Sequence, residues 1–329
     1  MTRVFINGID GLFGAKIAQA LSANPTVTII GLGRTTPSAP VGRAEYLTAH
    51  LSGRQLRELL RTEQIEVVIH LAFAGAESPI ASREDAVQQN VLGSMELLGA
   101  CVGSRVRRVL VRSHTAVYGA NPLNPSLITE TRPIARSHAP SVIRDYTEVE
   151  QFLTDFALQH PALCIVPMRC ASLLGAWSPI IDYFTQTEPH MLVGFDPCLQ
   201  FLHLDDAVAG FALAALAPTC GAFNLAADET FCLSQALKLI GKQPKLVLEP
   251  VVSLALALGS RDALGLWPFD PSFLRHSCVT DTTKARNELG WAPIHTASAA
   301  LQALNANDQA VEQRETTEEA LRAFLARRS

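Results

Sequence analysis

The sequence predicts an α/β fold with a doubly wound parallel sheet, and two observations carry this prediction. Short runs of apolar and β-branched residues alternate with segments of helical periodicity through the first half of the 329-residue chain. Such alternation is typical of parallel strands that are joined by crossover helices. The predicted strands are also apolar at nearly every position, which is expected where helices cover both faces of a sheet.

The expected elements follow one another at short intervals. We expect strands at 4–7, 27–32, 66–71, 109–112, 163–168 and 222–226. We expect helices at 15–23, 54–62, 87–102 and 207–216, and a further helix after residue 141. That helix places six apolar or aromatic side chains on one face: Val142, Tyr146, Val149, Phe152, Leu153 and Phe156. Beyond residue 226 the pattern predicts helices and loops, with a charged surface helix at 308–328.

The composition indicates a large folded core and argues against nucleic acid as a partner. Hydrophobic residues make up 48% of the chain and charged residues 18%, so a large core can be buried. The length of 329 residues suggests about two domains, or one nucleotide domain with a sizeable additional segment. The net charge of -4 does not suit a polyanionic partner. We interpret the densest basic stretch as the solvated edge of a strand: Arg105, Arg107, Arg108 and Arg112.

Cysteine use and the N-terminal pattern predict a cytoplasmic protein. The 7 cysteines include no CxxC pair, and none has zinc-ligand spacing, so we expect reduced thiols and no metal site. The chain enters a strand at once, without a signal-peptide pattern. The longest uncharged apolar run, 251–258, is too short to cross a bilayer.

A glycine-rich turn follows the first predicted strand and precedes a helix. Its glycines, Gly8, Gly11 and Gly14, have the spacing GxxGxxG, with Leu12 and Phe13 between the last two. Glycine permits the tight turn and lets the backbone approach a pyrophosphate, which the free N–H groups of the helix start attract. The position inside a βαβ unit therefore predicts a dinucleotide site.

Six further segments make the chain resemble the extended short-chain dehydrogenases/reductases, the NAD-dependent epimerases and dehydratases. They are Val68-Ile69-His70-Leu71-Ala72, Asn90-Val91-Leu92-Gly93, Val117-Tyr118-Gly119, Arg169, Phe201 to Asp206, and Asp281 to Pro293 with its Lys284 and Leu289-Gly290-Trp291. The resemblance implies a Rossmann domain at 1–168, to which 199–227 return. It also implies a smaller, mostly helical substrate domain at 169–198 and 228–329, a cleft between the two, and a homodimer. Leu71, Ala72 and Asn90 would lie beside the cofactor.

The end of the second strand departs from this family. The acidic residue that would bind the adenosine ribose is replaced by Gly33, and Arg34 follows it. Glycine leaves room for a 2′-phosphate and arginine supplies a charge-assisted fork, so we predict NADP, with NAD as the alternative. An exposed arginine without a ligand is the competing interpretation. The family's Asp near the adenine is His50 here.

The catalytic positions depart further. The family's Ser or Thr is His114 in this chain, and the family's Tyr-xxx-Lys can be aligned in two registers. In the register that we favour, Val142 takes the Tyr position and Tyr146 the Lys position. In the other, Tyr146 is the Tyr and Glu150 takes the Lys position. The lysine is absent from both, so nothing lowers the tyrosine pKa from about 10, and the usual proton transfer is impaired.

Other groups could carry the protons. We predict His114 as acid/base, with Tyr118 or Tyr146 orienting the substrate. Its pKa is expected near 6.5, shifted by burial or a neighbouring charge. A packed strand-end histidine is the competing interpretation. His70 and His203 are expected to be structural, and Asp205 or Asp206 to cap a helix. The segments 120–141 and 176–198 are expected to line a substrate pocket.

The sequence thus predicts a dinucleotide-binding enzyme of the epimerase/dehydratase type, and its residues do not identify the substrate. It would be NADP-linked and act on a small organic substrate by a non-standard mechanism. Two alternatives remain open: a non-redox lyase, cyclase or isomerase on the same scaffold, and a nucleotide-sensing protein without catalysis.

Overall fold

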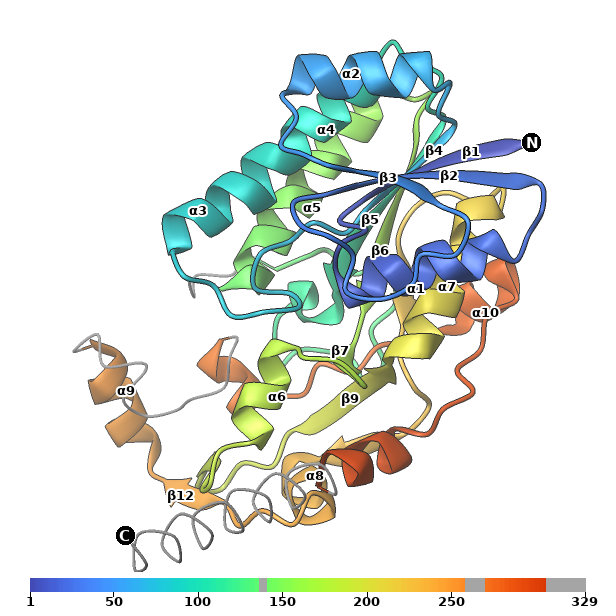
Figure 1. The fold of residues 1–329 in the computed structure, drawn as a ribbon. Coiled ribbons are helices and arrows are strands. Elements are labelled where there is room, and N and C mark those ends of the chain that lie inside the picture. Colours follow the sequence, from blue (N-terminus) through green and yellow to red (C-terminus); the bar gives the residue numbers. More distant parts are fainter. Residues whose placement is uncertain (136–140, 258–269, 306–329) are drawn as a thin grey trace, which may run out of the picture.

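Seven parallel strands form the central sheet, in the order β10-β6-β5-β4-β1-β2-β3 (Figure 1). The computed structural model describes residues 1–135, 141–257 and 270–305. Every pairing between neighbouring strands of this sheet is parallel, so the predicted doubly wound α/β fold is confirmed. The strands are β1 (Thr2–Asn7), β2 (Val27–Gly33), β3 (Glu45–Thr48), β4 (Val67–His70), β5 (Arg108–His114), β6 (Cys164–Cys170) and β10 (Phe223–Leu225).

Helices cover both faces of the sheet, and alternate residues of a strand point into opposite cores. In β1, Val4 and Ile6 join one core and Phe5 joins the other. The core of Val4 contains residues of α1 (Leu12–Ser22), α7 (Leu204–Leu216) and α10 (Thr283–Leu289). The core of Phe5 contains residues of α2 (Gly53–Thr62), α4 (Gly93–Cys101) and α5 (Val142–Gln159). Burial on both sides explains why the strands are apolar throughout.

The observed elements differ from the prediction in one helix and one strand. The helix expected at 87–102 is continuous from α3 (Arg83–Val87) through a π-helical turn (η1, Gln88–Leu92) into α4. Strand β3 was not predicted, because all four of its residues are exposed and carry no apolar pattern. The helix expected at 308–328 lies outside the described residues.

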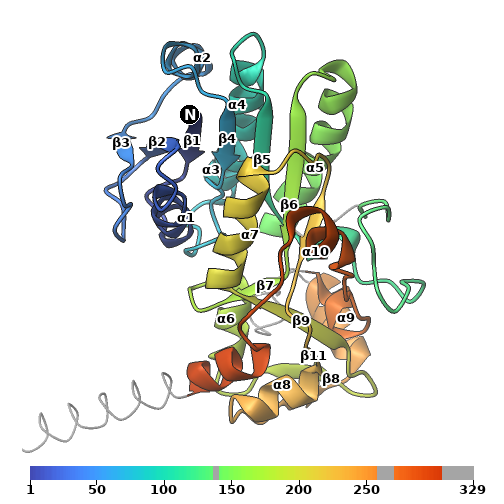
Figure 2. The same ribbon diagram turned by 90° about the vertical axis from the view of Figure 1, so that its right-hand side faces the viewer.

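A smaller lobe lies below the carboxyl end of the sheet (Figure 2). Its strands form a three-stranded sheet in the order β11-β9-β7 and a two-stranded sheet of β12 and β8. These strands are β7 (Ser172–Leu174), β8 (His190–Leu192), β9 (Cys198–His203), β11 (Thr230–Cys232) and β12 (Lys245–Val247). Its helices are α6 (Pro179–Phe184), α8 (Leu233–Leu239) and α9 (Glu249–Ala257). Two short 3-10 helices complete the described elements: η2 (Thr115–Tyr118), directly after β5, and η4 (Pro271–Leu274).

The boundary between the lobes differs from the one that the sequence predicts. Within the predicted return at 199–227, α7 and β10 pack on the large sheet, whereas β9 belongs to the small one. The return therefore begins at Leu204. Among its described residues, the lobe also contains strands that were not expected, because strands of three residues are too short to give a sequence pattern.

One pair of cysteines departs from the expected reduced state. Cys164 at the start of β6 forms a disulfide with Cys220, just before β10, with 5.5 Å between their Cα atoms. The parallel pairing of β10 with β6 brings these distant residues together. The prediction that all cysteines are reduced is wrong at this pair.

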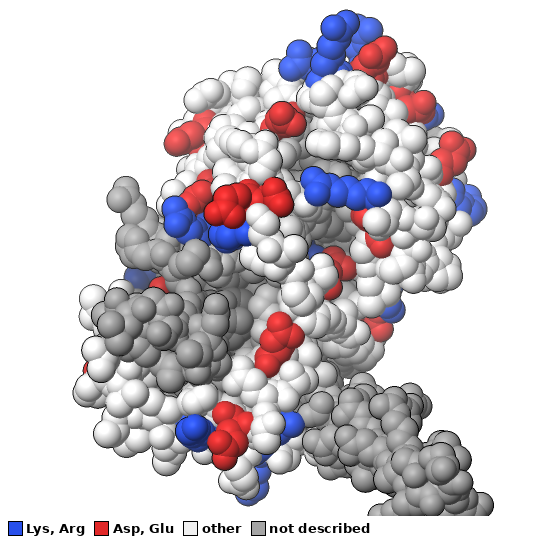
Figure 3. All heavy atoms as spheres, turned by 60° about the vertical axis from the view of Figure 1, so that its left-hand side comes forward, with Lys and Arg blue, Asp and Glu red and all other residues white. Residues whose placement is uncertain are grey.

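The surface and the helices give two further observations. Basic and acidic side chains are interspersed over the face shown in Figure 3. Among the helices of the described residues, none is both long enough and apolar enough to span a bilayer.

Candidate functional site

The turn between β1 and α1 requires glycine at two positions. Gly8 has a φ of +95°, and a Cβ added there would lie 2.9 Å from the Ala72 nitrogen. A Cβ at Gly14 would collide with the carbonyl oxygen of Gly8. Backbone atoms therefore contact each other at Gly8 and Gly14, and neither position has room for a side chain. Gly11 precedes α1, whose first N–H groups are left for a partner outside the helix.

This turn opens on a cleft of about 780 Å³ along the carboxyl edge of the sheet. Parallel α/β sheets bind ligands at this edge. The cleft is lined by most of the predicted cofactor residues, namely Gly8, Gly11, Leu12, Arg34, Leu71 and Ala72, together with Asp10, Gly33, Thr35, His50 and Trp177. The backbone N–H of Phe13 donates to Glu77, which lines the cleft. The ring of Phe13 packs edge-on against Phe211.

A carboxylate of the chain itself lies at the start of α1. The N–H of Phe13 donates to Oε2 of Glu77 at 3.1 Å. The other oxygen of Glu77 accepts from Nη1 of Arg112 at 2.6 Å. The positive end of a helix attracts anions, so Glu77 stands at the position that suits a phosphate.

Arg112 corrects the prediction for the basic stretch of β5. Arg112 and Arg108 are 5% and 8% exposed, so they are buried and do not form a solvated edge. Arg108 donates to the carbonyl oxygen of Thr219 at 2.6 Å, and Arg112 lies over the ring of Phe13. A cation is thus buried beside the glycine turn, where it faces the anion position.

The comparison with known families bears on this cleft. A family model described as the NAD dependent epimerase/dehydratase family matches residues 4–226. The chain belongs to this family. The match covers the glycine turn, nearly all of the large sheet and the strand β9, so the resemblance seen in the sequence is confirmed.

Individual known proteins are similar to this chain over most of its length. An uncharacterised protein of Mycobacterium tuberculosis is 27% identical over 317 residues, covering 88% of this chain and 80% of that protein. The UDP-glucose 4-epimerase of Azospirillum brasilense is 24% identical over 328 residues, covering 89% of this chain and 88% of the relative. The structure of a UDP-glucose 4-epimerase of Thermotoga maritima with UDP-glucose superimposes with a TM-score of 0.70, at 19% identity, over 94% of this chain and 99% of that one. This structural likeness shows a shared fold.

The positions that correspond to the family's catalytic residues meet around a small cavity. His114, Val142 and Tyr146 line it, with Arg112 and Ser172. Its volume of about 20 Å³ holds about one water molecule. Arg112 lines this cavity while Glu77 lines the large cleft, so their ion pair stands between the two spaces.

The structure places Glu150 away from this cavity. Its carboxylate accepts from Nε of Arg169 at 3.0 Å and from the hydroxyl of Ser113. Val142 and Tyr146, one helical turn apart on α5, both line the cavity instead. This arrangement favours the register in which Val142 takes the family's Tyr position and Tyr146 its Lys position.

His114 is held as a neutral imidazole. Its Nδ1 accepts from the N–H of Ala116 at 2.9 Å, and its Nε2 lies 3.4 Å from the hydroxyl of Ser172. Burial, and secondarily the charge of Arg112, lower the pKa of His114 to about 3. Burial and a neighbouring charge were expected to shift the pKa of His114 from 6.5, and the shift is large because this strand end is covered, which the sequence does not show.

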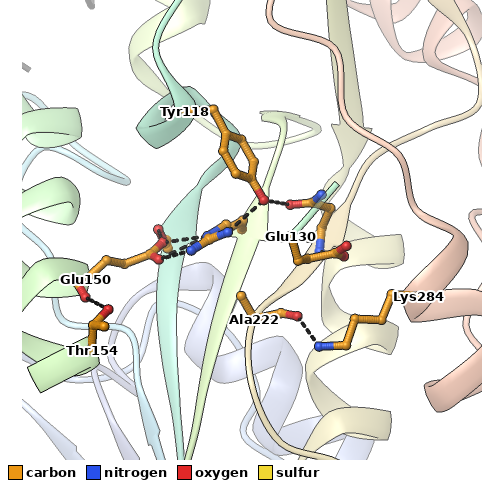
Figure 4. Close-up of polar contacts among 9 residues, drawn as sticks. Tyr118, Glu130, Glu150, Thr154, Ala222 and Lys284 are labelled. Atoms are coloured by element: carbon orange, nitrogen blue, oxygen red, sulfur yellow. Dashed lines mark hydrogen bonds and ion pairs between the residues drawn. The ribbon is translucent and has the colours of Figure 1, made fainter. Parts of the chain in front are cut away.

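Tyr118 does not reach the cavity of His114. Its hydroxyl accepts from Nη1 of Arg169 at 2.7 Å and donates to Oδ1 of Asn224 at 2.7 Å (Figure 4). Figure 4 shows Glu150 and Tyr118 on either side of the guanidinium group, in a network that joins α5 to β10. Burial raises the pKa of Tyr118 to about 12. The predicted catalytic role of Tyr118 finds no geometric support.

Tyr146 lies at the cavity but is poorly suited to give up a proton. Its ring packs 4.6 Å from that of Phe73, and burial raises the pKa of its hydroxyl to about 12 despite the nearby Arg112. It therefore stays neutral at ordinary pH and offers a hydroxyl for hydrogen bonding only.

Asn90 acts beside the cleft rather than in it. Its amide donates to the carbonyl oxygen of Ala74 at 3.0 Å and to Asp145 at 2.7 Å, and its Oδ1 accepts from the Ala74 N–H. Asn90 thus fixes the loop after β4 and does not itself line the cleft, and its place beside a cofactor stays a prediction. His70 is structural as predicted: it bridges Asn7 and Ser94, and burial lowers its pKa to about 4.

The residue that caps α7 is not one of the two aspartates that were predicted to cap it. His203 is itself the N-cap, because its Nδ1 accepts from the N–H of Asp205 at 3.2 Å. Asp206 instead accepts from the backbone of Ile294 and His295. Ligand-type atoms of His203, Asp205 and His295 lie within 4.8 Å of one another, a grouping that the sequence did not reveal, and Asp205 also pairs with Lys16 at 2.7 Å.

The two loops expected at the substrate line different spaces. Ala176 and Trp177 border the large cleft, and Ser178 to Ile180 border the cavity of His114. Residues 120, 121, 132, 133 and 135 border a separate cavity of about 440 Å³ beside Tyr118. Glu77 and Asp10 were missed by the sequence interpretation; an acidic residue inside a glycine turn was the one signal available for Asp10.

Proposed function

We propose that this chain is a dinucleotide-binding enzyme of the epimerase/dehydratase type. The observation that carries the proposal is the glycine turn of Gly8, Gly11 and Gly14, opening with the start of α1 on a cleft of about 780 Å³. The residues fit the group: the turn and the Phe13 N–H would hold the diphosphate, and Gly33 and Arg34 would face the adenosine ribose.

A bound nicotinamide dinucleotide supplies a hydride acceptor or donor to this site. The chain's own contribution is limited by its side chains. His114, neutral and bonded through Nδ1 to Ala116, offers the proton on Nε2 to an oxygen atom, and Tyr146 offers its hydroxyl. Val142 has no proton to transfer. Hydrogen-bond donation to a substrate oxygen is the chemistry that these residues support.

The substrate is proposed only as a small polar molecule. Relatives are named UDP-glucose 4-epimerases, so a nucleotide sugar is the first class to test. The cavity of about 20 Å³ beside His114 is too small for a sugar, so a substrate could reach His114 only if residues that line the cavity were displaced.

A second candidate is a nucleotide-sensing protein without catalysis. The small size of the cavity beside His114 and the absence of the family's Lys favour it. The two candidates share nucleotide binding and differ in turnover. Incubation of the purified protein with oxidised dinucleotide and UDP-sugars, followed at 340 nm and by product chromatography, separates them: substrate conversion supports the enzyme, and binding without conversion supports the sensor.

Nucleotide binding itself is tested by titrating NADH and NADPH into the protein with calorimetric detection. We expect the wild type to bind at least one of them, and Gly11→Val to weaken that binding by about two orders of magnitude, because its branched side chain enters the diphosphate path. A Cβ at Gly11 meets only the flexible end of Glu77, at 2.8 Å, so this variant should fold.

The matched control is Gly99→Val on α4, where an added Cβ meets nothing within 4 Å. Thermal unfolding of both variants shows that each is folded. Equal dinucleotide affinity in the wild type and Gly11→Val, or no binding by the wild type, would remove the proposal.

A further inference from the structure

Asp10 lies within the glycine turn and reaches the end of β2. A Cβ added at Gly33 would lie 2.7 Å from both Cβ and Cγ of Asp10, and 2.9 Å from its Oδ1. The carboxyl group of Asp10 thus fills the space that a side chain at position 33 would enter. Asp10, Gly33 and Arg34 all border the cleft.

The carboxylate is fixed through one of its two oxygens. Oδ2 accepts from the backbone N–H groups of Arg34 at 2.9 Å and Thr35 at 3.1 Å, and from the Thr35 hydroxyl at 3.2 Å. The carbonyl oxygen of Asp10 accepts from the N–H of Ser38 at 3.0 Å. Oδ1 accepts no hydrogen bond from the residues that the structure describes. One oriented acceptor with a negative charge is therefore left at this corner of the cleft.

The end of β2 itself, at Gly33 and Arg34, carries no carboxylate. The structure shows that the glycine turn delivers a carboxylate to the same place from residue 10. The hydrogen bonds to Arg34 and Thr35 also tie the loop after β2 to the turn. Gly33 is then explained without a phosphate: a side chain at position 33 would displace Asp10.

We propose that Asp10 binds the adenosine ribose and selects NAD(H) over NADP(H), an inference that rests on the proposed nucleotide binding. A carboxylate oxygen accepts hydrogen bonds from ribose hydroxyls. A 2′-phosphate brings about two negative charges and no donor, so the same oxygen repels it. The exposed Arg34 attracts that phosphate, but Asp10 is the more tightly positioned of the two charges. This inference reverses the NADP prediction made from Gly33 and Arg34.

The decisive variant is Asp10→Asn. Its amide oxygen can take over the three hydrogen bonds of Oδ2, and its amide nitrogen replaces the charged Oδ1, so the turn keeps its structure. We expect the wild type to bind NADH at least about tenfold more tightly than NADPH, as one charge-assisted hydrogen bond implies. In Asp10→Asn, the affinity for NADH should fall about tenfold and that for NADPH should rise. Calorimetric titration measures both without requiring turnover.

Two controls separate charge from loop structure. Thr35→Val removes one donor to Oδ2 and keeps the carboxylate, so the ratio of the two dissociation constants should stay at its wild-type value. Arg34→Ala should weaken NADPH further and leave NADH unchanged. Together these variants distinguish a charge effect of Asp10 from a general disturbance of the turn.

Failure of this inference differs from failure of the proposed function. If neither dinucleotide binds the wild type, both fall. If the wild type binds NADPH as tightly as NADH, or if Asp10→Asn leaves the ratio unchanged while both still bind, Asp10 is not the selector and only this inference is overturned.

Discussion

At the scale of single residues, acidic side chains decide the character of the cleft. Glu77 lies at the start of α1, where it accepts from the Phe13 N–H, and it pairs with the buried Arg112. A helix start and a buried cation form an anion site, and the chain fills this site with its own carboxylate. An incoming diphosphate must displace Glu77.

Glu77→Gln should therefore strengthen dinucleotide binding. The amide keeps the shape of Glu77 but competes for the Phe13 N–H and Arg112 without a charge. If the competing charge-assisted hydrogen bond contributes about 1.5 kcal/mol, the affinity should rise about tenfold. Titration with NADH measures this change. Glu63→Gln, which removes a carboxylate paired with Arg3, is the control and should have no effect; weaker binding in Glu77→Gln would contradict the competition.

At the scale of elements, a buried ion pair joins α5 to β6. Glu150 and Arg169 have side chains that are 3% and 8% exposed, and Arg169 extends the network to Tyr118 (Figure 4). In the register that the structure favours, Val142 and Tyr146 lie on the same helix, two turns and one turn before Glu150. The pair thus fixes the rotation of α5 that turns Val142 and Tyr146 toward the cavity.

Glu150→Gln should destabilise the fold by about 3–5 kcal/mol, because it leaves the buried charge of Arg169 without its partner. Urea unfolding measures the difference. Glu148→Gln is a matched control on the same helix: its partner Arg144 is exposed, 2.8 Å away, and the expected change is below about 1 kcal/mol. Similar values for the two variants would show that the pair does not anchor α5.

At the scale of the whole molecule, two buried histidines make stability depend on pH. The pKa of His70 is lowered to about 4 and that of His114 to about 3, both mainly by burial. The unfolded chain takes up these protons near pH 6.5, and the folded chain does not. Their contribution is complete above pH 6.5 and is lost as the pH falls from 6.5 toward 4 and 3.

For His70 alone this linkage amounts to roughly 3 kcal/mol between pH 6.5 and pH 4, at about 1.4 kcal/mol for each pKa unit. His70→Gln keeps groups that can bond to Asn7 and Ser94 but cannot titrate. Its free energy of unfolding should therefore fall by about 3 kcal/mol less than that of the wild type over this range. The exposed His50→Gln is the control. An identical pH dependence in His70→Gln and the wild type would show that His70 is not buried as a neutral group.

The sequence by itself determined the parallel sheet and the glycine turn. Both depend on local properties: apolar runs of strand length, helical periodicity, and glycines where Gly8 must adopt a positive φ and Gly14 must touch the backbone. The strands β7, β8, β11 and β12 have three residues each, and β3 is exposed, so they left no such pattern.

Only the tertiary structure decided what stands in the cleft. Asp10 meets Arg34 across 24 positions of the chain, and Glu77 meets Phe13 across 64. The burial that keeps His114 neutral comes from residues on β6, α5 and α6 that pack around it. Periodicity and spacing report which face a residue occupies within its own element. The charge and protonation of a site depend on which distant elements cover it, and that is set by packing.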